Sequence, residues 1–112
     1  MMRITFEGKP ISVNQLYTGR RFLTPKGKAT KEAYGWAAKK QYKGKLITCD
    51  VDVQITFYFE NKRSDIDNCL KAALDSLTGI VWEDDSQIQS ILVVKYIDKE
   101  NPRTEIEVIV DC

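Results

Sequence analysis

The chain has 112 residues, of which 43% are hydrophobic and 29% are charged, and its formal net charge at pH 7 is +1. This composition is that of an ordinary globular domain, and it indicates neither an intrinsically disordered chain nor a membrane-spanning protein. The near-zero net charge provides no overall attraction to nucleic acid or to an acidic membrane, so any electrostatic specialisation must be local.

Two residue types restrict the chemistry further. The chain contains no histidine, which excludes histidine-based acid/base catalysis and a Ser-His nucleophile, so carboxylates, lysines or a metal-activated water must do such work. Cys49, Cys69 and Cys112 show no CxxC spacing and are expected to be free thiols in a reducing compartment. The first residues lack the apolar core of a signal peptide, so we expect one cytoplasmic domain over residues 1–112.

The N-terminal part predicts a strand, a loop and a helix. Apolar and polar residues alternate from Met2 to Glu7, which is typical of a half-buried strand. A polar, turn-rich loop is expected over 12–29, followed by a helix from about Thr30 to Tyr42 with Gly44 as its stop signal. The expected packing side of this helix consists of Ala29, Ala33, Trp36, Ala37 and Lys40.

The C-terminal part predicts three strands and a second helix. Five apolar residues alternate with polar ones over 51–59, which is the clearest strand pattern in the chain. A helix is expected over 66–77, closed by Gly79, with an apolar stripe of Leu70, Ala73, Leu74 and Leu77. Strands over 88–97 and 104–110 are joined by a polar turn and predict a β-hairpin. The fold class is therefore α+β, a small single domain with two main helices packed on a mixed or mainly antiparallel sheet of about four to five strands.

Two pairs of aspartates flank the second helix. Asp65 and Asp67 lie at its N-terminus, where a single aspartate suffices to cap the free backbone N–H groups, and Asp84 and Asp85 precede the next strand. Four carboxylates in one cleft repel one another unless a cation neutralises them, and magnesium favours such oxygen ligands. Lys71, one turn beyond Asp67 on the same helix face, is placed to neutralise part of the charge or to contact a phosphate.

The same residues also allow a purely structural interpretation. Asp65 then acts as an N-cap, Asp84 and Asp85 are polar turn residues, and Lys71 is a solvated helix residue. The pattern of charges does not by itself separate this interpretation from a metal site.

The full string resembles the core motif of the RusA-like Holliday junction resolvases. That motif is roughly D-x-D-N-x-x-K-x-x-x-D-x-L followed after a short spacer by D-D-x-Q. The matching positions are Asp65, Asp67, Asn68, Lys71, Asp75, Leu77, Asp84, Asp85 and Gln87. A shorter segment with Pro10, Ser12 and Asn14, and with Tyr17 nearby, is similar to the family's N-terminal Pro-x-Ser-x-Asn sequence.

The resemblance implies a homodimeric, magnesium-dependent endonuclease that cuts four-way DNA junctions by paired symmetric nicks, with manganese as a substitute ion. It implies that Asp65, Asp67 and Asp85 hold the metal, that Asp84 is a further candidate ligand, and that Lys71 supports catalysis. Branched DNA and a second copy of the chain are the expected partners, with no membrane and no nucleotide cofactor. Family members are often clearly basic, whereas this chain is nearly neutral.

DNA contacts are expected from local basic clusters and from polar or aromatic residues beside them. Lys62 and Arg63 directly precede Asp65, where they offset repulsion between the acidic site and a phosphate backbone. The loop over 12–29 contributes a second basic patch and Tyr17, which is able to stack on an unpaired base. The candidate residues are Arg20, Arg21, Lys62, Arg63, Asn14 and Tyr17. Trp36 and Trp82 are expected to be core residues, with Trp82 shaping the loop that presents Asp84 and Asp85.

Two other classes of function remain open at this point. One is a non-catalytic protein that binds branched DNA and retains the fold. The other is a structural or interaction protein in which a cation bound to the acidic cluster only holds loops together. Magnesium-dependent cleavage of a synthetic four-way junction distinguishes all three.

Overall fold

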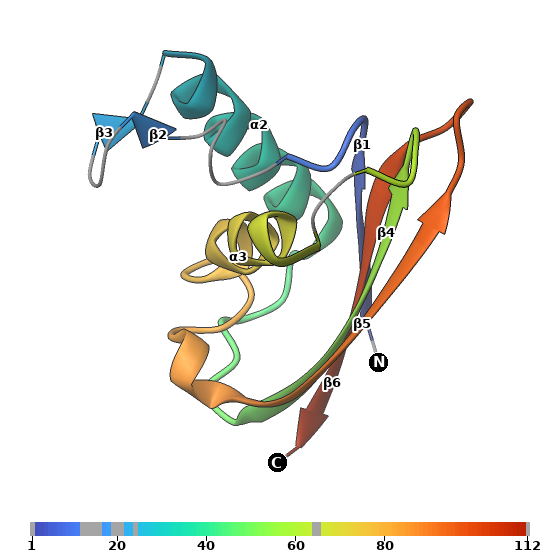
Figure 1. The fold of residues 1–112 in the computed structure, drawn as a ribbon. Helices are drawn as coiled ribbons and strands as arrows, with labels where there is room; N and C mark the ends of the chain where they lie inside the picture. The colour runs from blue at the N-terminus through green and yellow to red at the C-terminus, as the bar shows by residue number, and fades with distance from the viewer. Residues whose placement is uncertain (1, 12–16, 19–21, 24, 64–65, 112) are drawn as a thin grey trace.

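Four strands form a mixed sheet in the order β1-β6-β4-β5 (Figure 1). The computed structural model describes residues 2–11, 17–18, 22–23, 25–63 and 66–111. β6 pairs antiparallel with both β1 and β4, whereas β4 and β5 run parallel. The strands are β1 (Met2–Glu7), β4 (Asp50–Phe59), β5 (Ile88–Ile97) and β6 (Arg103–Asp111).

Alternation along the strands directs one set of side chains into the core. In β4, Val51, Val53, Ile55, Phe57 and Phe59 are all buried, while the residues between them are half-buried or exposed. Ile4 and Phe6 of β1 and Ile106 and Val108 of β6 are buried on the same side of the sheet. The predicted strands over 2–7 and 51–59 and the α+β fold class are therefore confirmed.

The predicted hairpin between β5 and β6 is wrong, although both strands exist. β4 lies between them, pairing with β5 on one side and with β6 on the other. The turn after β5 crosses the end of β4, where the Asp98 N–H donates to the Phe59 carbonyl at 2.8 Å. Two sheet spacings are roughly 10 Å, a distance that this short polar connection spans easily. Periodicity therefore identified the strands and not their partners.

The first long helix, α2 (Pro25–Gln41), begins five residues earlier than predicted. Pro25 suits the first helical position because its fixed φ is helical and the missing N–H would have no partner there. The buried side of α2 consists of Tyr34 and Ala38, with the Tyr34 ring stacked on Phe6 of β1 at 4.3 Å between centroids. The packing side expected from the sequence was wrong, because Ala29, Ala33, Trp36 and Lys40 are exposed, Trp36 by 72%, and Ala37 is only half-buried.

The second helix, α3 (Ile66–Leu77), has the bounds expected from the sequence. Its fully buried side is rotated slightly from the predicted stripe, so that Leu70 and Leu74 are only half-buried. Gly79 follows the helix with a φ of +88°, a conformation that glycine adopts without strain. The buried residues of α3 are Cys69, Ala72, Ala73, Ser76 and Leu77.

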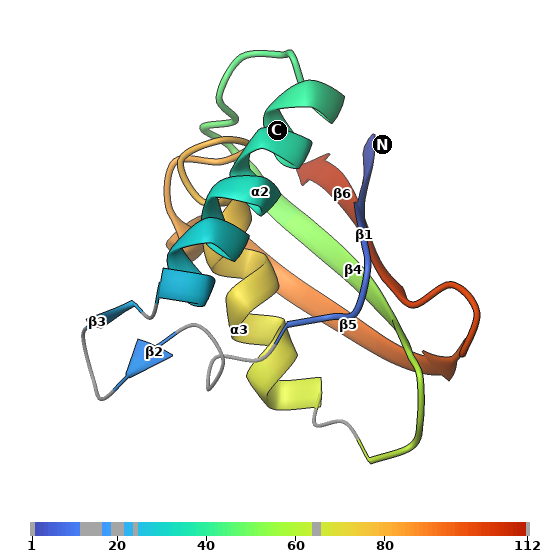
Figure 2. The same cartoon turned by 90° about the horizontal axis from the view of Figure 1, so that it is seen from above.

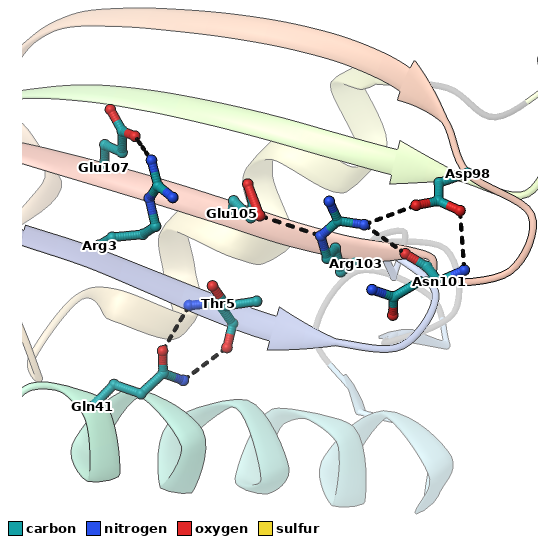
Figure 3. Close-up of polar contacts among 8 residues, drawn as sticks. All are labelled: Arg3, Thr5, Gln41, Asp98, Asn101, Arg103, Glu105 and Glu107. Carbon is teal, nitrogen blue, oxygen red and sulfur yellow. Dashed lines mark hydrogen bonds and ion pairs between the residues drawn. The ribbon is translucent and has the colours of Figure 1, made fainter.

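Both helices cover the same face of the sheet, and the hydrophobic core lies between the two layers (Figures 1 and 2). Two short strands, β2 (Tyr17–Thr18) and β3 (Phe22–Leu23), pair with each other before α2. Figure 3 shows how Gln41 at the end of α2 ties the helix to β1, because its side chain exchanges two hydrogen bonds of 2.7 Å with the Thr5 backbone.

The opposite face of the sheet carries polar contacts within β6, between β6 and β1, and between β6 and the turn after β5. Arg103 donates to Asp98 at 3.0 Å and to Glu105 at 3.2 Å, and Arg3 pairs with Glu107 (Figure 3). Of the helices in the described ranges, none is long and apolar enough to cross a membrane.

The cysteines differ partly from expectation. Cys69 is buried on α3 and is not part of a disulfide, as predicted. Cys49 is disulfide-bonded, so the prediction of a free thiol was wrong for this residue, and Cys112 lies outside the described residues.

Candidate active site

Helical periodicity brings three charged residues of α3 to one side of the helix. Asp67, Lys71 and Asp75 are spaced four residues apart, so their side chains follow one another along the surface of α3. Asp67 and Lys71 are exposed, and Asp75 is half-buried. Leu70 and Leu74 lie beside them and form the apolar floor of the same surface.

Asp85 joins this surface from a different element. It is the first residue of η1 (Asp85–Gln87), a short 3-10 helix that leads directly into β5. Together with α3 it lines a cleft of about 360 Å³, and a second cleft continues from Leu74 and Asp85 along the start of β5. The lining residues of the first cleft are Asp67, Leu70, Lys71, Leu74, Asp75 and Asp85.

Gln87 holds the turn that presents Asp85. Its amide nitrogen donates to the backbone carbonyls of Ile47 and Cys49 at 2.8 Å each, and its amide oxygen accepts from the Asp84 N–H at 2.9 Å. A single side chain therefore joins η1 to the segment that enters β4, and it restricts where Asp85 can lie relative to α3.

Trp82 anchors the connection between α3 and η1 from the inside. Its ring has no exposed surface, and its indole N–H donates to the Thr78 hydroxyl at 3.0 Å. The Thr78 hydroxyl in turn donates to the Leu74 carbonyl at 3.1 Å, and the backbone N–H of Ile47 donates to the Val81 carbonyl at 2.8 Å. The prediction that Trp82 is a core residue shaping this loop is confirmed.

Asp84 is directed differently from its neighbour Asp85. Its carboxylate accepts a hydrogen bond of 2.6 Å from the Ser86 hydroxyl, and this bond lowers the pKa of Asp84 below its ordinary value. Asp84 is absent from the side chains that line the cleft, whereas Asp85 is one of them.

The charge of the cleft favours a cation. Three of its lining side chains are carboxylates and one is a lysine. Exposed carboxylate oxygens are the donors that magnesium takes in proteins, usually together with several waters. Among the described residues, no three acidic or cysteine side chains are close enough to hold a metal ion by themselves. The fit to magnesium therefore rests on the chemistry of the exposed carboxylate donors.

Several residues predicted for the site lie outside the described part of the chain. These are Asp65, Asn14, Arg20 and Arg21. Tyr17 belongs to the short strand β2, and nothing is described of its side chain. Lys62 and Arg63 are exposed in the turn between β4 and α3, where the Arg63 N–H donates to the Asn61 side chain at 2.9 Å.

Two contributions to the site were not assigned a role from the sequence. Asp75 lines the cleft, and its spacing of four residues from Lys71 is the signal that would have indicated this. The role of Gln87 depends on carbonyl groups forty and thirty-eight positions away in the chain, so no local pattern predicts it.

Comparisons with known proteins identify the family of this chain. The family model described as Endodeoxyribonuclease RusA matches residues 7–109. A crossover junction endodeoxyribonuclease RusA from Aquifex aeolicus (strain VF5) is 36% identical over 67 residues, which cover 57% of this chain and 52% of that protein. The chain thus spans about half the length of this relative. Because the family model covers nearly all of the chain, including α3, η1 and the cleft between them, the chain belongs to the RusA endodeoxyribonuclease family.

Proposed function

We propose that the protein is a magnesium-dependent endonuclease that resolves four-way DNA junctions and related branched DNA by paired symmetric nicks, acting in recombination and repair. The observation that carries the proposal is the cleft in which Asp67, Lys71 and Asp75 of α3 meet Asp85 of η1. Membership of an endodeoxyribonuclease family and the name of the Aquifex relative support it.

Asp65, Asp67 and Asp85 are the proposed ligands of magnesium, which manganese is able to replace. When bound, the ion supplies Lewis acidity toward water and toward the phosphodiester oxygens. The carboxylates orient the attacking water through hydrogen bonds, and the apolar side chains of Leu70 and Leu74 limit access of bulk water to one side of the cleft. Asp84 is a weaker candidate ligand because its carboxylate already accepts from Ser86.

Lys71 is the proposed cationic partner of the reacting phosphate. It lies between Asp67 and Asp75 on the surface of α3, and its ammonium group is a strong donor for an oxyanion. Negative charge grows on the phosphoryl oxygens in the transition state, so a positioned lysine contributes more to turnover than to substrate binding.

Lys62 and Arg63, exposed at the entrance of α3, are the proposed phosphate contacts nearest to the cleft. Arg20, Arg21, Asn14 and Tyr17 are proposed to contact DNA from the segment before α2. Two symmetric nicks require two opposed active sites, and each chain of 12.9 kDa supplies one cleft.

A homodimer is proposed for that reason, with its interface on the sheet face that the helices leave uncovered. Leu92, Tyr96 and Ile109 are 57%, 55% and 46% exposed on this face, although their side chains are apolar or aromatic. Burial against a second copy removes this surface from water. Light scattering should give twice 12.9 kDa for the native chain and 12.9 kDa for Leu92→Lys. A native monomer that still resolves junctions would contradict the dimer.

The decisive experiment is cleavage of a synthetic four-way junction with magnesium and, in parallel, with EDTA. The native chain should nick opposed strands only with the ion, and Asp67→Asn and Asp85→Asn should abolish cleavage. Glu100→Gln is the matched control, because it removes one exposed carboxylate from the turn between β5 and β6. Junction binding without cleavage by the native chain would instead favour a non-catalytic protein that binds branched DNA.

A further inference from the structure

The outer side of α2 combines an exposed tryptophan with an unusual concentration of lysines. Trp36 lies two residues from each of the buried residues Tyr34 and Ala38, which places it on roughly the opposite side of the helix. Its 72% exposure is the largest among the exposed large hydrophobic residues of the described chain. The core prediction failed here because the helix packs through its other side.

The charge of this region differs from that of the rest of the chain. Residues 25–45 contain seven lysines and one glutamate, whereas the remainder has ten basic and fifteen acidic residues. The near-neutral total therefore conceals a strongly basic helix on an otherwise acidic protein. A polyanion approaching the chain is attracted to this helix more than to any acidic surface around it.

The lysines of this face are available for an external partner. Lys28, Lys31, Lys39, Lys40 and Lys43 are exposed, and within the described ranges none forms an ion pair with a carboxylate. The ammonium group of Lys39 lies 5.5 Å from the centre of the Trp36 ring, so an aromatic surface and a positive charge stand side by side.

The helix that carries this face also lies beside an element of the active site. A Cβ built on Gly35, the neighbour of Trp36, would be 3.8 Å from the Ile80 side chain in the connection between α3 and η1. α2 and α3 lie side by side on the same face of the sheet (Figure 2). One DNA molecule with its branch at the cleft can thus reach the outer side of α2.

We propose that this face, defined by Lys28, Trp36, Lys39 and Lys40, is a second DNA contact that holds an arm of the branched substrate beside the cleft. The lysines contact phosphates, and Trp36 stacks on a base that is left unpaired at the branch point. The choice of branched DNA as the ligand rests on the proposed function. The contact itself is inferred from the exposed tryptophan and the lysines of α2. A protein partner is disfavoured because the exposed neighbours of Trp36 are alanines and charged residues rather than an apolar cluster.

The test uses the intrinsic fluorescence of the full chain in EDTA. The chain has two tryptophans, and Trp82 has no exposed surface, so acrylamide quenching reports Trp36. Binding of a four-way junction or a short oligothymidylate should protect Trp36 from acrylamide and reduce its emission. Trp36→Phe provides the background from Trp82 and should show neither change.

Binding titrations separate the aromatic contact from the charges. Trp36→Ala should weaken binding of junctions and oligothymidylate by roughly five- to a hundredfold, with little effect on blunt linear duplex, because duplex bases are already stacked. Lys39→Gln with Lys40→Gln should weaken binding to all three and reduce the slope of log affinity against log salt by about 1.8 on the duplex. The matched double change to arginine should keep the native slope, because it retains both charges.

The outcomes also distinguish this contact from the nuclease activity. DNA that binds without altering acrylamide quenching of Trp36 would overturn the second contact, and cleavage with magnesium would then still support the proposed function. Protection of Trp36 by DNA in a chain that does not cleave the junction would support the second contact and contradict the nuclease activity. Failure of both DNA probes to bind would overturn the contact.

Discussion

The side-chain amide nitrogen of Gln87 lies 2.8 Å from the backbone carbonyl oxygen of Cys49, and this hydrogen bond fastens η1 to the segment that enters β4. The same nitrogen donates to the Ile47 carbonyl, so one amide satisfies two acceptors that are partly shielded from water. Asp85 begins η1, and its approach to α3 therefore depends on a residue that does not line the cleft with it.

Gln87→Ala should destabilise the protein by about 1–2 kcal/mol, because it removes the two hydrogen bonds that the amide donates to the Ile47 and Cys49 carbonyls. Urea denaturation measures this change. Gln89→Ala is the matched control, since it removes an exposed glutamine two residues away and should alter stability by less than about 0.5 kcal/mol. Equal effects of the two substitutions would contradict the role of Gln87.

The same substitution should lower the turnover of junction cleavage at temperatures where the variant remains folded, because Asp85 loses its fixed position relative to α3. Gln87→Glu keeps an acceptor for the Asp84 N–H but has no donor for the two carbonyls, so it should behave like Gln87→Ala. The measurement is kcat at saturating junction, with circular dichroism to verify folding. Native kcat in both variants would show that η1 is positioned by other contacts.

Magnesium should raise the melting temperature of the native chain, because an ion that binds only the folded cleft stabilises it by mass action. At ten times the Kd the gain is roughly 1.4 kcal/mol, which corresponds to a shift of about 5–10 °C for a domain of this size. Asp67→Asn should remove most of the shift, and Glu100→Gln should retain it. Identical melting curves in magnesium and in EDTA would count against a metal site.

Substitution of Lys71 should mainly affect turnover, whereas substitution of Lys62 and Arg63 should mainly affect DNA binding. Lys71→Ala should lower kcat at least tenfold with a change in Kd of only a few fold, because its charge acts mainly on the transition state. Lys62→Ala with Arg63→Ala should weaken binding and reduce the salt slope by about 1.8, with smaller effects on kcat. Gel shifts in calcium and magnesium time courses measure both quantities. Equal losses of kcat and of DNA affinity in all of these variants would contradict separate roles for Lys71 and for the pair Lys62 and Arg63.

Asp52 and Asp111 form a carboxyl pair on the uncovered face of the sheet, and the pair makes stability depend on pH. The hydrogen bond between the two carboxyl groups raises the pKa of Asp111. The pKa of Asp52 is lowered, because Asp52 accepts a hydrogen bond of 2.5 Å from the Ser90 hydroxyl and a second one from Asp111. A raised carboxyl pKa means that the fold disfavours the charged form. The contribution of Asp111 is therefore lost as pH rises through its folded pKa, and that of Asp52 is lost as pH falls through its own.

Asp111→Asn should consequently be more stable than the native chain at pH 7, because the amide donates to Asp52 without a second negative charge. The difference should disappear as the pH falls toward the ordinary aspartate value of 3.8, where Asp111 in the native chain is protonated and donates the same bond. Thermal melts across this range measure the difference. A difference in melting temperature that stays constant between pH 7 and pH 4 would contradict a proton shared between Asp52 and Asp111.

The elements of this protein whose cause is local could be predicted from the order of its residues. Alternation over 51–59 identified β4 because each side chain in a strand faces opposite to the next, and the stop at Gly79 followed from its backbone freedom. The spacing of Asp67 and Lys71 predicted their common helix face for the same reason. The family motif, which reflects a fixed spacing of residue types, predicted Asp85 as a site residue, and Asp85 lines the cleft together with α3.

The way in which those elements meet depends on contacts that form between distant segments during folding. Two strands joined by a short turn were expected to pair, but β4 takes the place between them because hydrogen-bond partners are chosen across the whole sheet. The outward direction of Trp36 depends on which side of α2 packs on β1, and the weak apolar pattern of this helix did not specify that side. The hold of Gln87 on η1 likewise depends on carbonyls that folding brings from a distant segment.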